Sequence, residues 1–510
     1  MQITLMMKTG RALLAGTALL SLAACTVPRT DALTDAEMAE LAQDRLDRMI
    51  GEDEEPVTGP IDIYEAMARA IKYNLDQLVE VREEILRNEE LNVESYDLLP
   101  DLVANANYSG RNNLPGSQST DVPNGATISP PSRSSDKTEL NAELTLSWDV
   151  LDFGLGWVRA KQSSDEIYIA EEQRRATINR VIEDVRTAYW RAVASQRLMG
   201  RIDRLERSAV AALNSSERQA AERTGNPLDA LNYQRELLGV LRSVQELRRD
   251  LGVAKNQLAA LMNLRQGQEY DVIVRPHADL SAPIVDADPD ELVFMALQNR
   301  PELREITYRL RINEREKDVA LLEVLPSISG FLGINYSDNK FLYNSNWLGY
   351  GARASWNLLN VFRLPARQDA LEAGDELLDA RALALTQAVA TQVFVAKARV
   401  LSLSEEANLA RRYHNLSDRI STQTRVQVRE GQLGQLQGVR EELNAVLGSL
   451  RYDVTYADLQ SAFANLYSSV GLDPYAPGLN GDESIDEMAQ ALRELWFDRG
   501  DSMAFNVASN

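Results

Sequence analysis

The sequence predicts an α + β fold in which very long helices alternate with pairs of strands, and in which one such unit occurs twice. Three observations predict it. Two long segments, 156–224 and 366–430, are rich in Ala, Glu, Arg, Leu and Gln and contain no proline. Four runs of about ten residues alternate with a period of two, and short landmarks recur in a fixed order. No stretch of about 20 apolar residues follows the N-terminal segment, so no membrane-spanning helix is expected.

The repeat rests on three landmarks whose order is the same in both halves. They are Leu99-Pro100 with Leu325-Pro326, 226 residues apart, Ser147–Asp152 (SWDVLD) with Ser355–Asn360 (SWNLLN), 208 apart, and the turn glycines Gly225 and Gly431, 206 apart. The chain is therefore expected to divide into five parts. They are a removed leader at 1–24, an N-terminal segment at 25–59, a first repeat at 60–275, a second repeat at 276–473 and an acidic tail at 474–510.

The N-terminal residues have the pattern of an export signal. Lys8 and Arg11 form a positively charged region before an apolar run at 12–20. This run is too short to span a membrane as a helix. The ending Leu-Ala-Ala-Cys25 resembles a bacterial lipoprotein box, which implies that Cys25 is lipidated and becomes the mature N-terminus. Thr26, in place of Asp, resembles lipoproteins sent to the outer membrane. The alternative is an ordinary secretory signal with an incidental cysteine.

Each repeat is expected to open on a capped helix. Asp62 and Glu65 have the spacing of a capping box at the start of a helix over 62–98. In the second repeat Asp288 is the expected cap, and Pro289 stands at the first helical position, where proline is tolerated.

Four runs then alternate between apolar and polar residues, which predicts strands. The strands are expected at about 101–110, 139–151, 327–338 and 347–358. Each is about as long as a tilted strand must be to cross a bilayer. Trp148 and Trp356 stand near the helix-side ends of their strands, where interfacial aromatic residues are common in membrane proteins.

Four strands cannot close into a barrel by themselves. An open edge in lipid leaves backbone groups unpaired at several kcal/mol each, and the smallest membrane barrels have about eight strands. If these strands span a membrane, several chains must therefore share one barrel. A half-buried sheet in a soluble sandwich is the alternative, and the polar loop 110–138, rich in Gly, Ser, Pro and Asn, argues against it.

A very long helix is expected after each strand pair. The ranges are 152–224 and 360–430, on the order of 100 Å each, with returning helices at 228–263 and 433–470. The turns are Gly225-Asn226-Pro227 and Gly431-Gln432. If the strands lie in an outer membrane, such hairpins would cross the periplasm with their turns at the far end. The alternative is a coiled-coil scaffold without a pore.

Composition excludes several classes of function. The net charge of −22 disfavours a nucleic-acid partner, because phosphates require a basic surface. The single cysteine excludes disulfides and cysteine-based metal sites, and the two histidines, His277 and His414, are far apart. No catalytic or phosphate-binding motif occurs. We expect no enzymatic activity, no cofactor and no metal.

The order of helix, strand pair, long helix, glycine turn and returning helix, used twice, resembles the TolC-type outer-membrane efflux family over about residues 60–473. Residues 62–76 resemble the opening helix of that family, and Leu-Asn-Tyr-Gln-Arg-Glu-Leu at 231–237 resembles its returning helix. The resemblance implies a homotrimer, a shared twelve-strand barrel in outer-membrane lipids and a helical periplasmic tunnel. It also implies that the turns dock to a periplasmic adaptor (membrane fusion protein) and an inner-membrane transporter of RND or ABC type. The duct would be passive.

The mouth of the tunnel departs from the family pattern. Family members often carry acidic rings six and nine residues after the second turn glycine, but Gln437 and Arg440 occupy these positions. Together with Arg429, Glu430 and Glu441, they form a candidate gate held by charge pairs between helices. A solvated helix face is the alternative, since exposed ion pairs contribute only about 0–1 kcal/mol each.

Two other functions fit the same sequence. One is an exit duct dedicated to type I protein secretion, and the other is an envelope lipoprotein without a pore.

Overall fold

The computed structural model describes residues 32–49, 55–128, 130–221, 227–265, 267–276, 287–475 and 483–501. The chain forms two compact units, 1–55 and 56–510, each considered by itself. In the first, helix α2 (Asp35–Met49) begins with a capping box, because the backbone N–H of Thr34 donates to Glu37 and that of Glu37 donates to the Thr34 hydroxyl. The export signal and Cys25 lie outside the described residues.

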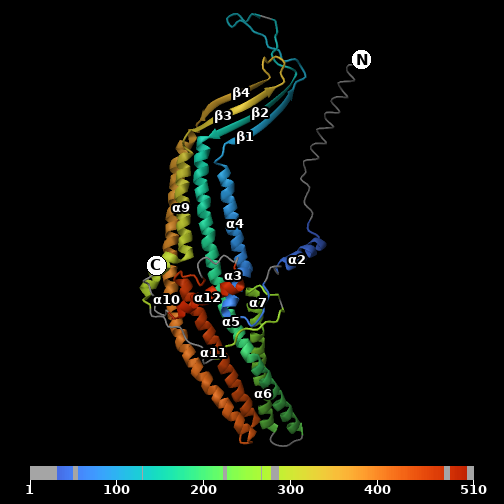
Figure 1. The fold of residues 1–510 in the computed structure, drawn as a ribbon, viewed down its shortest axis with the longest axis vertical. Coiled ribbons are helices and arrows are strands. Elements are labelled where there is room, and N and C mark those ends of the chain that lie inside the picture. The colour runs from blue at the N-terminus through green and yellow to red at the C-terminus, as the bar shows by residue number, and fades with distance from the viewer. Residues whose placement is uncertain are drawn as a thin grey trace, which may run out of the picture. The chain divides into compact units, whose positions relative to one another are not determined.

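The second unit holds the remaining elements. In chain order they are α3 (Ile63–Tyr73), α4 (Leu75–Tyr96), β1 (Asp101–Gly110), β2 (Thr138–Asp149), α5 (Val150–Ala221), α6 (Pro227–Gly252), α7 (Ala254–Leu261), α8 (Pro289–Asn299), α9 (Pro301–Leu322), β3 (Ser327–Ser337), β4 (Asn346–Ser355), α10 (Leu359–Arg429), α11 (Gln435–Ser469) and α12 (Ile485–Asp501). The sheet lies at one end of α5 and α10, and the turns into α6 and α11 lie at the other (Figure 1). The predicted fold class, a duplicated unit of long helices and strand pairs, is confirmed.

The four strands form one antiparallel sheet in the order β1-β2-β3-β4. The β2–β3 pairing joins the hairpins of the two halves, although the halves are far apart in sequence. Its register places Leu102, Leu146, Leu332 and Tyr350 in one row across all four strands, and Ala104, Leu144, Ile334 and Leu348 in the next. The period-two pattern of each strand therefore combines into one continuous apolar face.

The opening helix expected at 62–98 is two helices. Asp62 caps α3 as predicted and accepts the backbone N–H of Glu65 at 2.7 Å, but α3 ends at Tyr73. The side chain of Asn74 caps α4 by accepting the N–H of Asp76, and its amide donates to the Leu261 carbonyl. A side chain that satisfies both a new helix start and a distant carbonyl makes the break at Asn74 favourable.

The second half has the same break, 226 residues later. Arg300 separates α8 from α9, and Pro301 opens α9 as Leu75 opens α4. Asp288 caps α8 by accepting the N–H of Asp290, with Pro289 at the first helical position, as expected. The returning helix of the first half is also divided, at Val253, whereas its counterpart α11 is continuous.

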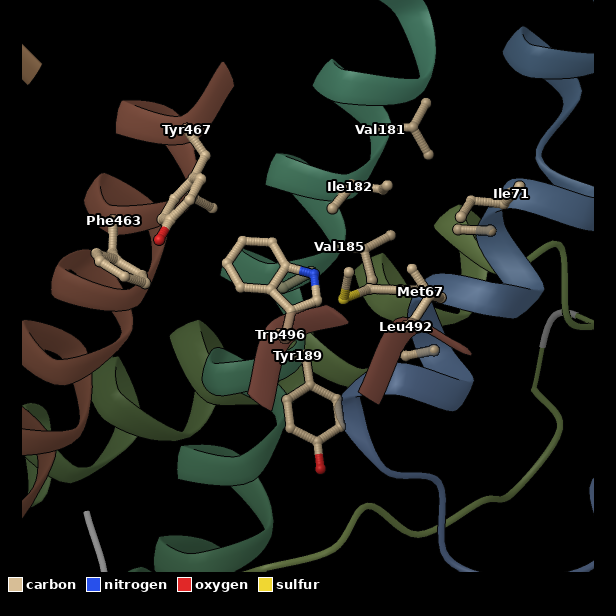
Figure 2. Packing of buried hydrophobic residues seen from close by; sticks show 14 of the residues in the cluster. Met67, Ile71, Val181, Ile182, Val185, Tyr189, Phe463, Tyr467, Leu492 and Trp496 are labelled. Carbon is tan, nitrogen blue, oxygen red and sulfur yellow. The ribbon is translucent and has the colours of Figure 1, made fainter. Parts of the chain in front are cut away.

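The main apolar core lies where α3, α5, α11 and α12 meet. Met67, Ile182 and Leu492 are fully buried there, and Trp496 packs beside Phe463 and Tyr467 (Figure 2). The indole N–H of Trp496 donates to the Pro474 carbonyl at 3.0 Å. This core joins the beginning, middle and end of the second unit.

The expectation of an acidic C-terminal tail at 474–510 is wrong for residues 485–501. These residues form α12, which buries Ile485, Met488, Leu492 and Trp496 in the core. Arg493 forms an ion pair with Asp62, the cap of α3. Asp486, Glu487 and Glu494 are exposed on its other face, so charge and core packing coexist in one amphipathic helix.

Candidate functional site

The sheet has one apolar and one polar face, and the apolar face is exposed in the single chain. Leu102, Ile334 and Leu348 are 65%, 59% and 60% exposed. A soluble chain buries such a surface against another layer. In the part of the chain that the structure describes, the sheet contacts α5 through β2 and β3, and its other contacts run chiefly between its own strands. A continuous apolar face on strands of bilayer length suits contact with lipid chains.

The opposite face is polar and closely packed. Asn105, Glu143 and Asn335 share one row on it, and the Glu143 carboxylate accepts a hydrogen bond from Thr145. Glycines make room for the larger neighbours, since a Cβ atom on Gly351 would lie 2.7 Å from the ring of Phe331. This face suits contact with water inside a barrel.

The two edges of the sheet are β1 and β4. Within the described chain, β1 pairs only with β2 and β4 pairs only with β3, so each has one unpaired side. Because the strands alternate in direction, β4 of one copy is antiparallel to β1 of a neighbouring copy. The edges are therefore complementary, which is the geometry a ring of identical copies requires.

Trp148 and Trp356 lie at the helix-side end of the sheet, where the sequence predicts them. Trp148 packs edge-on against Phe153 with ring centroids 5.6 Å apart. The indole N–H of Trp356 donates to the Val324 carbonyl at 2.8 Å, and the side chain is 56% exposed. Both rings thus present apolar surface outward at the junction of strands and helices.

The far end of the long helices contains the turns. Pro227 begins α6, while Gly225 and Asn226 lie outside the described residues. In the second half, Gly431 adopts φ +74°, the N–H of Gln432 donates to the Gln427 carbonyl at 2.9 Å, and the N–H of Gly431 donates to the Val428 carbonyl at 3.1 Å. These two hydrogen bonds form a Schellman motif, which explains why the chain turns at this glycine.

The candidate gate residues do not form one cluster in the single chain; each makes its own local contacts. Arg429 ends α10 and Glu430 is its C-cap residue. The amide of Gln437 donates to Glu441 one turn away on the same helix, at 3.1 Å. Arg440 pairs with Glu236 of α6 at 3.6 Å, with both side chains about half exposed. Of the five, only Arg440 has an observed charge pair between helices.

A second charge cluster, which the sequence analysis did not single out as a unit, joins three helices of the two hairpins. We call it the hairpin cluster: Arg201 of α5, Asp418, Ser421 and Arg425 of α10, and Glu442 of α11. Glu442 accepts from the Ser421 hydroxyl and from Arg425, both at 2.7 Å, and from Arg201 at 3.3 Å. Arg201 also pairs with Asp418 at 3.4 Å.

The electrostatics of the hairpin cluster favour an ionised Glu442. Burial alone would raise the pKa of this carboxyl group, but the hydrogen bonds from Ser421 and Arg425 and the charge of Arg201 outweigh it, and the pKa is lowered. The cluster borders a cavity of about 740 Å³ between α5, α10 and α11. Glu442 thus connects the hairpin of the first half to that of the second.

The described residues hold no group of three or more His, Cys, Asp or Glu side chains suited to a metal ion. Among the described helices, none is both long and apolar enough to span a bilayer.

Comparison with known families agrees with this geometry. Residues 82–264 match the family model described as outer membrane efflux protein, from α4 through the first strand pair and hairpin. The predicted resemblance to the TolC-type outer-membrane efflux family is confirmed. No curated protein sequence matches the chain significantly.

Solved structures of outer-membrane channels share the fold of this chain. The Campylobacter jejuni CmeC outer membrane channel aligns with a TM-score of 0.62 at 12% identity, covering 92% of this chain and 97% of CmeC. The Neisseria gonorrhoeae MtrE channel in its open state aligns at 0.59 and 16% identity, covering 83% and 95%. CusC, whose structures describe transmembrane channel formation, aligns at 0.61 and 20% identity, covering 82% and 95%. These alignments show that the chain shares the fold of these channels.

Proposed function

We propose that the chain is one subunit of a homotrimeric, passive exit duct that crosses the outer membrane and the periplasm. The observation that carries this proposal is the four-strand sheet, which has an exposed apolar face and two complementary unpaired edges. Three copies would supply twelve strands, enough to close a barrel with a polar interior. The number three follows from the resemblance to TolC-type channels.

In this assembly β4 of each copy pairs with β1 of the next, and the ring closes after three steps. Backbone groups that are unpaired in one chain, at several kcal/mol each in lipid, become paired in the trimer. The long helices that follow the strands would then line a common tunnel, with the turns of α5–α6 and α10–α11 at its periplasmic mouth.

Cysteine cross-linking tests the trimer, because Cys25 is the only native cysteine. Each test variant carries Leu348→Cys in β4 and a second cysteine in β1, at Leu102, Ala104 or Ala106. We expect these variants to give covalent trimers in native membranes. A matched control, Ala106→Cys with Ala142→Cys, joins register partners of one chain and should give cross-linked monomers only. Covalent dimers without trimers, or no oligomer in any combination, would refute the proposed closure.

The partners in the proposal are a periplasmic adaptor and an inner-membrane transporter of RND or ABC type. The turns at Gly225, Asn226 and Pro227 and at Gly431 and Gln432 would dock to the adaptor. What supports this is that α6, which begins at Pro227, and α11 both start at the end opposite the sheet (Figure 1). Replacing each turn with a Gly-Ser linker of equal length should preserve the trimer and abolish export, measured as cargo accumulation in cells. Full export by the linker variants would remove the turns from the docking site.

The remaining residue assignments of the proposal concern the membrane. Cys25 would carry the lipid anchor, and Trp148 and Trp356 would lie at the periplasmic boundary of the bilayer. Palmitate labelling in cells should be lost in Cys25→Ser, while the trimer persists because the barrel itself is embedded. Labelling of Cys25→Ser equal to that of the native chain would exclude this anchor.

A further inference from the structure

A shallow hollow interrupts the apolar face of the sheet. Its volume is about 740 Å³, and its floor is Gly330 of β3 and Ala352 of β4, which are register partners. Its walls are the larger side chains that share this face around them, Trp148, Leu146, Ile328, Leu332 and Tyr350. The lining is therefore almost wholly hydrocarbon.

The hollow exists because Gly330 differs from the other glycines of β3 and β4. Cβ atoms on Gly333 and Gly351 of the polar face would lie 2.7 Å from Thr145 and Phe331, so neighbouring side chains already fill those spaces. A Cβ on Gly330 would have no atom within 4 Å. The space above Gly330 is open and faces outward from the apolar side.

We infer that this hollow binds one acyl chain of a phospholipid from the periplasmic-side leaflet. The inference rests on the proposed function, in which the apolar face contacts the bilayer. In that orientation Trp148, Val150 and Pro100, which border the hollow, stand at the helix-side end of the strands and hence at the periplasmic boundary. Water has few polar partners in the hollow, whereas a methylene chain gains dispersion contacts with its apolar walls.

The site is tested by filling it. Gly330→Leu places an apolar side chain in open space without a clash and keeps the apolar face, so the fold and assembly should be retained. Ala106→Leu is the matched control, since it adds a larger apolar side chain to the same face of β1, away from the hollow. Each protein is reconstituted with phosphatidylethanolamine and phosphatidylglycerol vesicles, delipidated in mild detergent and weighed by native mass spectrometry.

We expect the native chain and Ala106→Leu to retain one phospholipid per subunit. Gly330→Leu should lower this occupancy about tenfold, because the leucine displaces the contacts of about two methylene groups at about 0.8 kcal/mol each. Equal retention by Gly330→Leu, retention of detergent alone, or no retained lipid in a membrane-embedded native trimer would overturn the inference. Failure of the native chain to enter membranes as a trimer would instead overturn the proposed function.

Discussion

The two ends of the long helices are held together by different forces. At the sheet end, backbone hydrogen bonds join the halves through β2 and β3. The exposed apolar face suits contact with lipid, and the free edges suit pairing with further copies. At the turn end, the halves are joined by an apolar cluster of α5, α6 and α11 that buries Val439 and Val446, and by the side-chain charges of the hairpin cluster. In the proposed trimer the sheet end closes through backbone hydrogen bonds, whereas each charge pair of the turn end contributes only about 1 kcal/mol.

The largest expected effect tests the sheet end. Leu144→Arg places a charge on the apolar face in the middle of β2, which costs about 2–4 kcal/mol where a strand faces lipid. We expect it to abolish the membrane-embedded trimer, measured by membrane fractionation and by gel mobility without heating. Thr145→Arg, the next residue, places the same charge on the polar face and should leave the trimer at least half as abundant as in the native chain. Similar behaviour of the two variants would contradict the assignment of the faces.

The next effect tests the turn end. Glu442→Ala removes the one carboxylate that contacts Ser421, Arg425 and Arg201, and the loss is expected to cost about 2 kcal/mol, because it leaves half-buried cations side by side. The trimer should persist while the conductance of single ducts in planar bilayers rises several-fold. The expected rise assumes that the hairpin cluster keeps the periplasmic mouth closed, and unchanged conductance would contradict this.

Acid should imitate this change with a smaller amplitude. The pKa of Glu442 is lower in the folded chain than in the unfolded one, so its stabilisation is complete above the ordinary glutamate pKa of about 4.5 and is lost as the pH falls through the lowered value. Conductance of the native duct should therefore rise as the pH falls below about 4.5. The Glu442→Gln duct has no carboxyl group at this position, so its conductance should lack that rise; a rise of equal size in the variant would assign the titration to another group.

A smaller effect is expected from the backbone of the turn. Gly431→Ala forces an alanine to φ +74°, which costs about 1 kcal/mol. Thermal unfolding should shift downward for this variant. Gly434→Ala is the control, because Gly434 has φ −71° and nothing within 4 Å of an added Cβ. Equal shifts for the two alanines would show that backbone conformation is not the cause.

The smallest effect is expected at Arg440. Its pair with Glu236 is about half exposed on both sides and 3.6 Å long, so Arg440→Ala should change stability by less than about 0.5 kcal/mol. Its conductance should equal that of the native duct. A conductance as high as that of Glu442→Ala would show that the Arg440–Glu236 pair contributes as much to closure as the hairpin cluster.

Much of the sheet end follows from sequence alone, because a period of two fixes both the strand and its face. The predicted range 101–110 coincides with β1, and the other three strands deviate by one to three residues at their ends. The turn at Gly431 was likewise predictable, since only a residue tolerant of positive φ completes the Schellman motif.

The hairpin cluster was not predictable in the same way. Arg201 and Asp418 are 217 residues apart, and no local pattern brings them together. The break at Asn74 was missed because its amide partner, the Leu261 carbonyl, is 187 residues away. For α12 a signal did exist: Ile485, Met488, Leu492 and Trp496 have helical spacing, but the surrounding charges suggested a tail.

The position of α12 has a consequence for biogenesis. The contact between Arg493 and Asp62 spans 431 residues, and the core around Met67 is completed by Leu492 and Trp496 from the last helix. A chain whose C-terminal segment has not yet been synthesised therefore lacks the side chains of α12 that complete the main core. If the chain is exported N-terminus first, as its signal pattern predicts, the main core cannot be completed until this last segment has crossed the membrane.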